Sequence, residues 1–557
     1  MKKYVMSFII ALVAVAIAVP ALAAVEFKYG GQFRARFEAE DNAFDGTNQG
    51  GFYGSNYNSD DNRRFIDQRL RLYFSFIASQ NLKVVVKFEM GDATWGMSSS
   101  SGSSVGNTGA NAGANVGADA VSVEVKNAYI EFKIPGTPTT AIIGVQGIEL
   151  MDSWMMDDDF AAALFITKLD PFTVTVGYIG AQNGWERKWD PTHELPLTNQ
   201  NFNIDEFLAV VDYKEGPFKA SLNMVFQDGH NTDVSLTPES TDTPIRNYTG
   251  FGGVGSPTSE WPFTNGLAPR NNYLFDFGVN VTYKVDFLMA YVNFIRNFGS
   301  VDLYSSINGE LPTQLGRAVK VTSADYQGWM VDAGTTYFCG PWTANIGGFY
   351  TSGPSISSTP ENNGLYDTTS GKFLGLSSKN VNWFTYVLDG EKTFSEIIGG
   401  GILGDDNYNG RGNVFNGSAG SHLGYADTTY WQGYGEPSNL WTVTLGGSYQ
   451  LAQQTKLSAA YWYFGTANAV PVAFNPNGTY KMNSSIGHEL NFYIDQGIVD
   501  GLKLTLVGAY LIADDAFCPL PVPTTTTDLA TMRGNLLYYT PHADNAYELG
   551  ARLQWSF

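Results

Sequence analysis

The sequence predicts an all-β fold, a transmembrane antiparallel up-and-down β-barrel of about 18 strands, with 16 as the alternative count. Apolar and polar residues alternate with a period of two in many short segments. The connections between these segments are short and long in turn. Mean hydropathy is only −0.14 although 43% of the residues are hydrophobic, as expected when apolar and polar faces alternate along each strand.

The N-terminal residues have the features of an export signal. Lys2 and Lys3 precede an apolar run from Val5 to Val19, and residues 20–23 have the small-residue pattern of a signal-peptidase site. The run is short for a membrane helix, which needs about 20 residues. We expect residues 1–23 to be a cleaved signal peptide and residues 24–557 to form a single barrel domain. No later apolar run is as long, so any membrane crossing must use strands.

The first alternating segment, from about residue 25 to 40, shows the pattern that the others repeat. Phe33, Ala35 and Phe37 alternate with Arg34 and Arg36, so we expect the apolar face to meet lipid and the polar face a water-filled lumen. Further segments are expected at about 64–76, 81–90, 125–134, 139–147, 161–169, 172–180, 205–214, 218–227, 272–284, 287–295, 328–338, 342–350, 440–450, 456–465, 488–496, 501–512 and 547–557.

Eight of the connections between these segments are tight turns, and the remainder are longer and rich in Gly, Ser and Asn. Tight turns on the periplasmic side and long loops on the extracellular side are typical of such barrels. An even number of strands then places both chain ends in the periplasm. The longest connection, residues 351–439, contains the partly apolar segment 382–390. This segment is expected to fold into the barrel mouth as a plug or to contact a neighbouring protomer.

The last segment ends the chain on an aromatic residue. Leu553, Trp555 and Phe557 share an apolar face and resemble the C-terminal signature of bacterial outer-membrane β-barrels, which the barrel-assembly machinery reads. The resemblance implies a porin in the outer membrane of a Gram-negative cell. It also implies contact with outer-membrane lipid and lipopolysaccharide and, by analogy with porins of this size, a homotrimer.

Projecting the polar faces inward collects charged residues on two sides of the lumen. We expect a basic sector from the first three segments and the last, and acidic residues about half a circumference away. Such an arrangement would create a transverse field that orients hydrated solutes and sets ion preference. The alternative is that these charges are solvated or paired across strands, for example with Glu38 and Glu89. The basic residues are Arg34, Arg36, Arg69, Arg71, Lys83, Lys87 and Arg552, and the acidic ones are Glu206, Asp212 and Asp276.

A second acidic group lies between the fifth and sixth expected strands. It consists of Asp152, Asp157, Asp158 and Asp159. In porins a loop near this position narrows the channel, so the resemblance implies carboxylates at a constriction. Binding of a hard cation and a solvated surface cluster are the alternatives.

Composition excludes several other functions. The formal net charge of −21 disfavours nucleic acid as a partner. With two Cys and five His, we expect neither a metal centre nor a cofactor. Cys339 and Cys518 should lie on opposite sides of the membrane and remain free thiols.

Catalysis is not expected either. His488 and Glu489 are adjacent on a strand and should face opposite ways, and His542 with Asp544 has no third partner. The sequence predicts passive diffusion of small hydrophilic solutes and ions. A substrate-selective channel for oligosaccharides or organic anions and a structural sheath around a partner protein are the alternatives.

Overall fold

The structure is a computed structural model. It describes residues 25–41, 63–95, 123–183, 202–231, 267–305, 321–353, 358, 366–367, 372–373, 380–381, 392–403, 437–517, 519–520 and 544–557. Four features named above lie outside these residues: the expected signal peptide, segment 382–390, Cys518 and His542.

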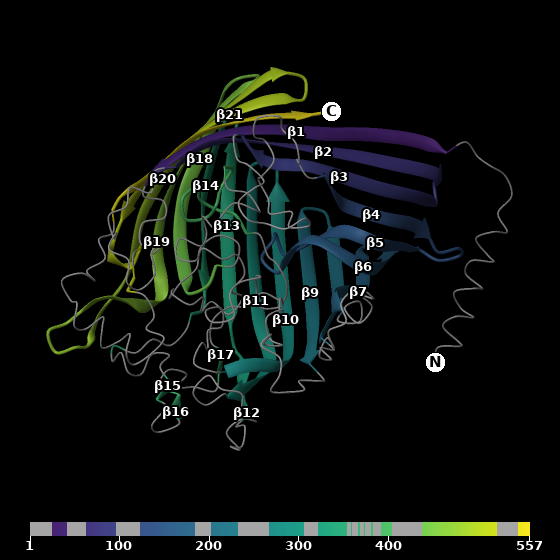
Figure 1. The fold of residues 1–557 in the computed structure, drawn as a ribbon. Helices are drawn as coiled ribbons and strands as arrows, with labels where there is room; N and C mark the ends of the chain where they lie inside the picture. Colours follow the sequence, from purple (N-terminus) through teal and green to yellow (C-terminus); the bar gives the residue numbers. More distant parts are fainter. Residues whose placement is uncertain are drawn as a thin grey trace.

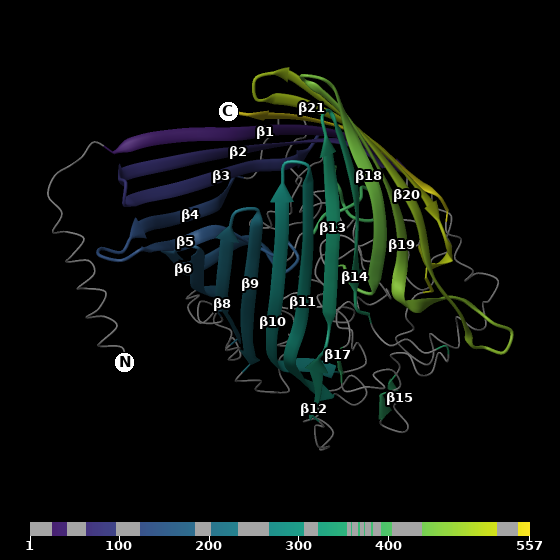
Figure 2. The same ribbon diagram turned by 180° about the vertical axis from the view of Figure 1, so that it is seen from behind.

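Eighteen strands form one antiparallel sheet that closes into a barrel, as the sequence predicts. Figures 1 and 2 show the sheet from opposite sides, with β1 lying beside β2. Consecutive barrel strands pair with each other, and β22 pairs with β1 to close the circle. The barrel strands are β1 (Glu26–Asp41), β2 (Arg63–Ser79), β3 (Leu82–Thr94), β4 (Val123–Lys133), β5 (Thr139–Leu150), β6 (Met156–Leu169), β7 (Phe172–Asn183), β8 (Phe202–Glu215), β9 (Phe218–Asn231), β10 (Leu267–Val285), β11 (Leu288–Ser305), β13 (Trp329–Cys339), β14 (Trp342–Thr351), β18 (Leu440–Ala452), β19 (Thr455–Phe474), β20 (Tyr480–Val499), β21 (Leu502–Ala513) and β22 (Ala546–Ser556).

The seam between β1 and β22 is held by the last residue of the chain. The backbone N–H of Phe557 donates to the carbonyl of Gly31, and the N–H of Gly31 donates to the carbonyl of Phe557, both over 3.0 Å. The Phe557 ring lies over Gly31, where an added Cβ would stand 2.5 Å from ring atom Cζ. The close approach of ring and backbone therefore requires a glycine at this position.

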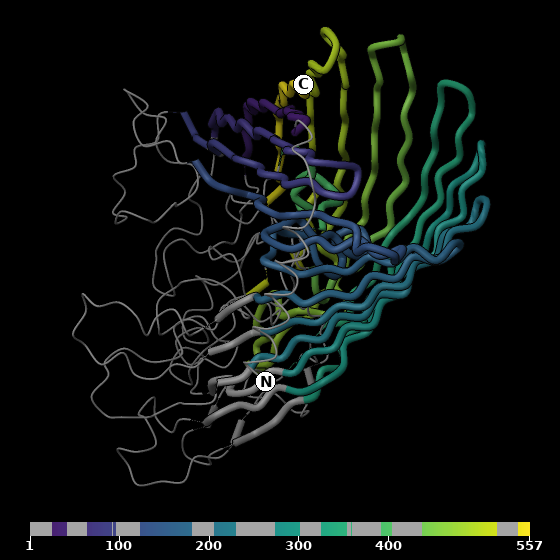
Figure 3. Tube along the Cα trace, turned by 90° about the vertical axis from the view of Figure 1, so that its right-hand side faces the viewer, coloured from purple at the N-terminus to yellow at the C-terminus, as the bar shows by residue number. Residues whose placement is uncertain are grey.

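Short turns lie at one end of the strands, as Figure 3 shows. They join β2 to β3, β4 to β5, β6 to β7, β8 to β9, β10 to β11, β13 to β14, β18 to β19 and β20 to β21. All eight tight turns expected from the sequence are present. Cys339 closes β13 directly before one of them and is an exposed free thiol.

The strands differ from the sequence-based expectation at the opposite rim. β19 continues nine residues past its expected end, and β20 begins eight residues before its expected start, so the two strands meet at a connection of residues 475–479. Gly, Asn and Pro within 465–475 concealed this extension, because these residues disfavour strand interiors. Register shifts around Gly465 and Pro471 accommodate them. The rim also carries β12 (Val321–Tyr326), which pairs with β11 and with the short strand β17 (Asn380–Val381).

Burial alternates along the strands as the sequence predicts. Arg36 on β1 is 2% exposed whereas the next residue, Phe37, is 44% exposed. On β22, Glu548 is buried and Leu549 is exposed. Charged residues therefore face the lumen, and large apolar residues cover the outer wall. Among the described residues, no helix is sufficiently long and apolar to cross a membrane.

Candidate functional site: the lumen wall and two inward segments

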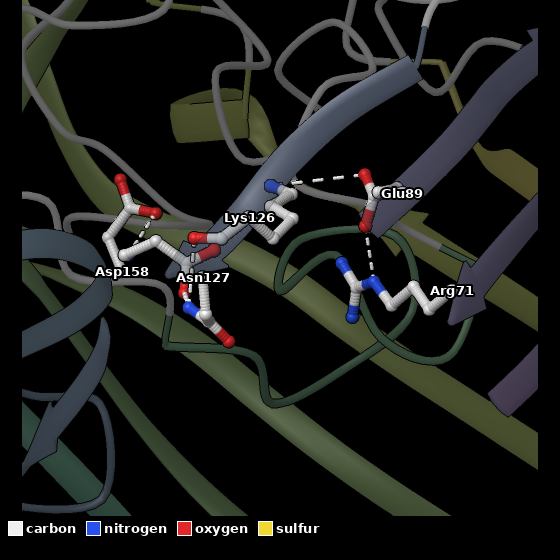
Figure 4. A network of polar contacts seen from close by, with 6 residues as sticks. Arg71, Glu89, Lys126, Asn127 and Asp158 are labelled. Carbon is white, nitrogen blue, oxygen red and sulfur yellow. Dashed lines mark hydrogen bonds and ion pairs between the residues drawn. The ribbon is translucent and has the colours of Figure 1, made fainter. Parts of the chain in front are cut away.

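The basic sector is lined with carboxylates. Arg36 faces Asp67 across the β1–β2 pair and binds it through two hydrogen bonds, from Nε over 3.1 Å and from Nη2 over 2.6 Å. Arg71 pairs with Glu89, which also lies 3.9 Å from Lys126 (Figure 4). Lys83 Nζ lies 2.7 Å from Glu131 Oε2 and forms a third pair. The expected basic surface is therefore interrupted by carboxylates at three places.

The other predicted basic residues also belong to this side of the lumen. Arg34 and Arg69 are buried and directly opposite each other in the β1–β2 register. Lys87 lies over the Tyr73 ring, with Nζ 5.8 Å from the centroid. Arg552, on β22, donates from Nη1 to the carbonyl of Ile402 over 3.2 Å. The structure therefore gathers the predicted residues on adjacent strands, and their role in selectivity stays a prediction.

The acidic residues expected on the far wall differ in their surroundings. Glu206 and Asp276 are fully buried, and Asp276 accepts a hydrogen bond from Asn297 Nδ2 over 2.6 Å. Asp212 is exposed near the turn that follows β8. Only the first two occupy the buried inner surface beside which a solute would pass.

The connection between β5 and β6 folds inward and forms the first inward segment, Met151–Met155. Met151, Asp152 and Ser153 have consecutive positive φ angles of 59°, 54° and 66°, a conformation that side chains with a Cβ rarely adopt. Trp154 is fully buried. Its Nε1 donates to Asp332 Oδ2 on β13 over 2.9 Å, so this short segment reaches strands far around the barrel.

Contacts from β11 complete this anchorage. Asn293 Nδ2 donates to Asp152 Oδ2 over 3.2 Å, and Tyr291 donates its hydroxyl to Asp332 Oδ1 over 3.1 Å. Buried hydrogen bonds between polar groups of this type fix a single geometry. The strained turn is thereby held across the lumen.

Of the predicted constriction carboxylates, only Asp152 lies in the inward segment. The placement of Asp157, Asp158 and Asp159 in the connection is wrong, because β6 begins at Met156 and includes them. Hydrogen bonding along β5 and β6 continues through these residues despite their low strand preference. Asp159 Oδ1 accepts from Asn127 Nδ2 over 2.5 Å. Figure 4 shows Asn127 close to Asp158 and beside Lys126.

A second inward segment, Lys392–Leu403, comes from the long connection between β14 and β18. Its backbone turns back on itself: Gly401 N–H donates to the Ser395 carbonyl over 2.7 Å, and Phe394 N–H to the Gly399 carbonyl over 3.2 Å. The Glu396 carboxylate accepts from the N–H groups of Ile402 and Leu403 over 3.0 and 3.3 Å. Burial, followed by the charge of Glu548, raises the pKa of Glu396 to about 8.

This second segment docks on the lumen wall at three places. Glu489 on β20 accepts from the Ile397 and Ile398 N–H groups over 2.9 and 3.2 Å and from Ser395 Oγ over 2.9 Å. Arg36 Nη1 on β1 donates to the Leu403 carbonyl over 2.5 Å. The third contact is the Arg552 hydrogen bond given above. Arg36 and Arg552, both predicted to line the pore, therefore bind backbone carbonyls of the second inward segment.

The two inward segments meet each other inside the barrel. Lys392 Nζ donates to the Asp152 carbonyl over 3.0 Å and lies 5.4 Å from the Trp154 ring centroid. Phe349 on β14 packs edge-on against both Trp154 and Phe394, at centroid distances of 5.0 and 4.9 Å. Together the segments form a partition that narrows the lumen.

Sequence reasoning missed residues 392–403 and assigned the plug role to residues 382–390. The available signal was the apolar trio Ile397, Ile398 and Leu403, which is costly to leave in water and is buried in the structure.

The described residues contain no group of three or more His, Cys, Asp or Glu side chains arranged to hold a metal ion. His488 and Glu489 point to opposite sides of β20. His488 Nδ1 is 2.7 Å from the hydroxyl of the exposed Tyr461, whereas Glu489 is buried in the lumen.

No family model matches the chain, and no curated protein matches it. Solved structures that resemble it include OccK5 (OpdH) of Pseudomonas aeruginosa, at 8% identity and a TM-score of 0.42 over 96% of this chain and 98% of that one. OpdK of the same organism, solved with vanillate, has the same identity, TM-score and coverage. OmpT of Vibrio cholerae shares 9% identity at a TM-score of 0.33, with coverage of 96% and 100%. The closed barrel of this chain is established by its own strand pairing.

Proposed function

We propose that the protein is an outer-membrane porin through which small hydrophilic solutes and ions diffuse passively. The observation that carries this proposal is the closed 18-stranded barrel whose buried charges face inward while its outer wall is apolar. A barrel of this size encloses an aqueous lumen. Its charged wall favours hydrated solutes over apolar ones.

The partition formed by Met151–Met155 and Lys392–Leu403 favours a substrate-selective channel over a wide, unselective pore. Each segment is anchored by several hydrogen bonds to wall residues, so it does not move aside without breaking them. Solutes must pass beside charged and amide groups. The resulting selectivity is proposed to depend on the predicted basic and acidic residues.

Several associated features belong to the same proposal. Residues 1–23 would direct export, and Leu553, Trp555 and Phe557 would be read by the barrel-assembly machinery. The mature chain would form homotrimers in contact with lipid and lipopolysaccharide, with both termini in the periplasm. The buried residues at the partition serve binding and passage, with no catalytic role.

Single-channel recording and liposome swelling test the function. Mature protein, shown to be folded by its heat-dependent mobility on gels, is placed in planar bilayers and in liposomes. Discrete conductance steps, with swelling rates that fall as neutral sugars or amino acids increase in size, are expected. Folded protein that gives neither steps nor swelling would contradict a diffusion channel and favour a sheath around a partner protein.

A further inference from the structure

We propose that the lumen wall around Arg36, Glu489 and Arg552 is a binding site for the main chain of short peptides, and that Lys392–Leu403 occupies it as a tethered ligand. The inference rests on the proposed channel function and names its substrate class: oligopeptides with small or apolar side chains.

The wall contacts are directed mainly at backbone atoms of the segment. Glu489 accepts two successive N–H groups, from Ile397 and Ile398. Arg36 and Arg552 donate to two successive carbonyls, those of Leu403 and Ile402. Every peptide has these N–H and carbonyl groups whatever its side chains, so a site of this kind recognises peptides as a class.

The charges of the wall suit the groups they bind. A buried carboxylate is stabilised by N–H donors, and a guanidinium by carbonyl or carboxylate oxygens. Glu489 is fully buried and Arg36 is 2% exposed. Hydrogen bonds to ionised groups are stronger than those between neutral groups. An oligosaccharide has hydroxyl groups. It lacks the two successive N–H donors that Glu489 binds and the two successive carbonyl acceptors that Arg36 and Arg552 bind.

A further amide acceptor stands beside this site. Asn491 is fully buried, and its Nδ2 donates to Glu489 Oε1 over 2.7 Å. Its Oδ1 accepts no hydrogen bond from the described residues. Buried polar atoms are normally hydrogen-bonded. The N–H group of a bound peptide would supply the missing donor to this oxygen.

The segment itself behaves as a preformed ligand. Its turn is stabilised internally by Glu396 and by its own backbone hydrogen bonds. Ile397, Ile398 and Leu403 are buried against the wall. Because it is attached at both ends, its effective concentration at the site is of millimolar order. A free peptide must therefore be tested after the tethered segment has been removed.

The test replaces Lys392–Leu403 with a Gly-Ser linker of equal length and supplies the missing sequence, KTFSEIIGGGIL, as a free blocked peptide. The probe's affinity for the folded variant is measured by calorimetry in detergent, and its effect on conductance in planar bilayers. We expect binding, and a reversible fall in the variant's conductance toward the wild-type level. The same peptide with the backbone N–H groups of the residues equivalent to Ile397 and Ile398 methylated cannot donate to Glu489 and should be at least tenfold weaker.

A second substitution locates the site. Glu489→Gln in the linker variant should weaken the probe at least tenfold, whereas Asp495→Asn should not, because Asp495 lies on the same strand and bonds to Thr505 and two lysines instead. Equal affinities for the two peptides, or no effect of Glu489→Gln, would overturn the proposal. Calorimetric binding without conductance steps would retain the peptide site and reject the channel function.

Discussion

Buried arginines in this lumen act as structural partners as well as charges. Arg36 binds Asp67 on the neighbouring strand and the Leu403 carbonyl in the second inward segment. A buried pair of this kind adds little net stability, but removing one partner leaves a charge with no compensation. The same side chain thus joins wall and partition.

Replacement of Arg36 by Met should destabilise the barrel by about 3–5 kcal/mol, because Asp67 then remains buried without its cation. The double variant Arg36→Met with Asp67→Leu should be considerably more stable than Arg36→Met alone. Urea unfolding in detergent measures both. Lys28→Ala serves as the control, since the Lys28–Glu26 pair is largely exposed and surface pairs contribute little. Equal losses in the single and double variants would contradict this explanation.

Trp154 is the corresponding anchor of the first inward segment. Trp154→Ala removes its hydrogen bond to Asp332 and its contact with Phe349, at a cost of about 3–5 kcal/mol for a buried aromatic. The strained turn should then leave the lumen, and single-channel conductance should rise. Trp342→Ala, at an exposed position beside a turn, should leave conductance unchanged. An unaltered conductance in Trp154→Ala would show that this segment does not restrict passage.

At the scale of the elements, the seam between β1 and β22 requires a residue without a side chain at position 31, which is Gly31. Gly31→Ala should lower the yield of folded barrel and reduce stability by about 1–3 kcal/mol, because the new Cβ meets the Phe557 ring and the Arg71 carbonyl at 2.5 and 2.8 Å. In Gly508→Ala on β21, the nearest atom is Leu549 Cδ2 at 3.5 Å. Heat-dependent mobility on gels compares the two. Similar yields would mean that the Phe557 ring moves aside readily.

The second inward segment should be sensitive to alkaline pH. The pKa of Glu396 is raised to about 8 in the docked segment from the ordinary value of 4.5, so docking retains a proton that the released segment loses. The stabilisation is complete below about 4.5 and is lost as pH rises through about 8. Glu548 disfavours the ionised form there, whereas hydrogen bonds from Tyr493 and from the Ile402 and Leu403 N–H groups favour it. Arg36 and Arg552, which bind the carbonyls of Leu403 and Ile402, are the neighbouring cations.

Conductance should therefore increase between about pH 7 and pH 9 as the segment is released. Glu396→Gln, which imitates the protonated carboxyl, should abolish this dependence. Asp515→Asn is the matched control, because a hydrogen bond from Lys481 lowers the pKa of Asp515 and this carboxylate does not titrate in that range. A pH response that persists in Glu396→Gln would assign the effect to another group.

The sequence predicted elements where alternation is regular and failed where tertiary contacts decide. The β1 pattern gave the correct faces for Arg36 and Phe37, because a strand period of two needs no knowledge of its neighbours. The extension of β19 and β20 depends on pairing across 465–486 that overrides the local preferences. The inward course of Lys392–Leu403 depends on Glu489, nearly a hundred residues away, and no local pattern records such a partner.

At the scale of the whole molecule, overall charge is a poor guide to the lumen. The chain has a formal net charge of −21, yet the wall from β1 to β4 combines cations with facing carboxylates such as Asp67, Glu89 and Glu131. Paired opposite charges cancel within a few ångströms, whereas unpaired charges act over about a Debye length of 8–10 Å. The channel's preference for anions or cations should therefore depend on the small local excess of one sign of charge along this wall.

Two opposing sets of substitutions test this balance by reversal potential under a salt gradient. The wild-type channel should discriminate weakly between anions and cations. Neutralising Arg34, Arg36, Arg69 and Arg71 together should move the preference toward cations. Neutralising Asp67, Glu89 and Glu131 should move it toward anions by a comparable amount, because each set leaves its former partners unpaired along the same wall. Shifts of the same sign, or none in either set, would mean that ions do not pass beside β1–β4 and that the conducting path follows the opposite wall, near Glu206 and Asp276.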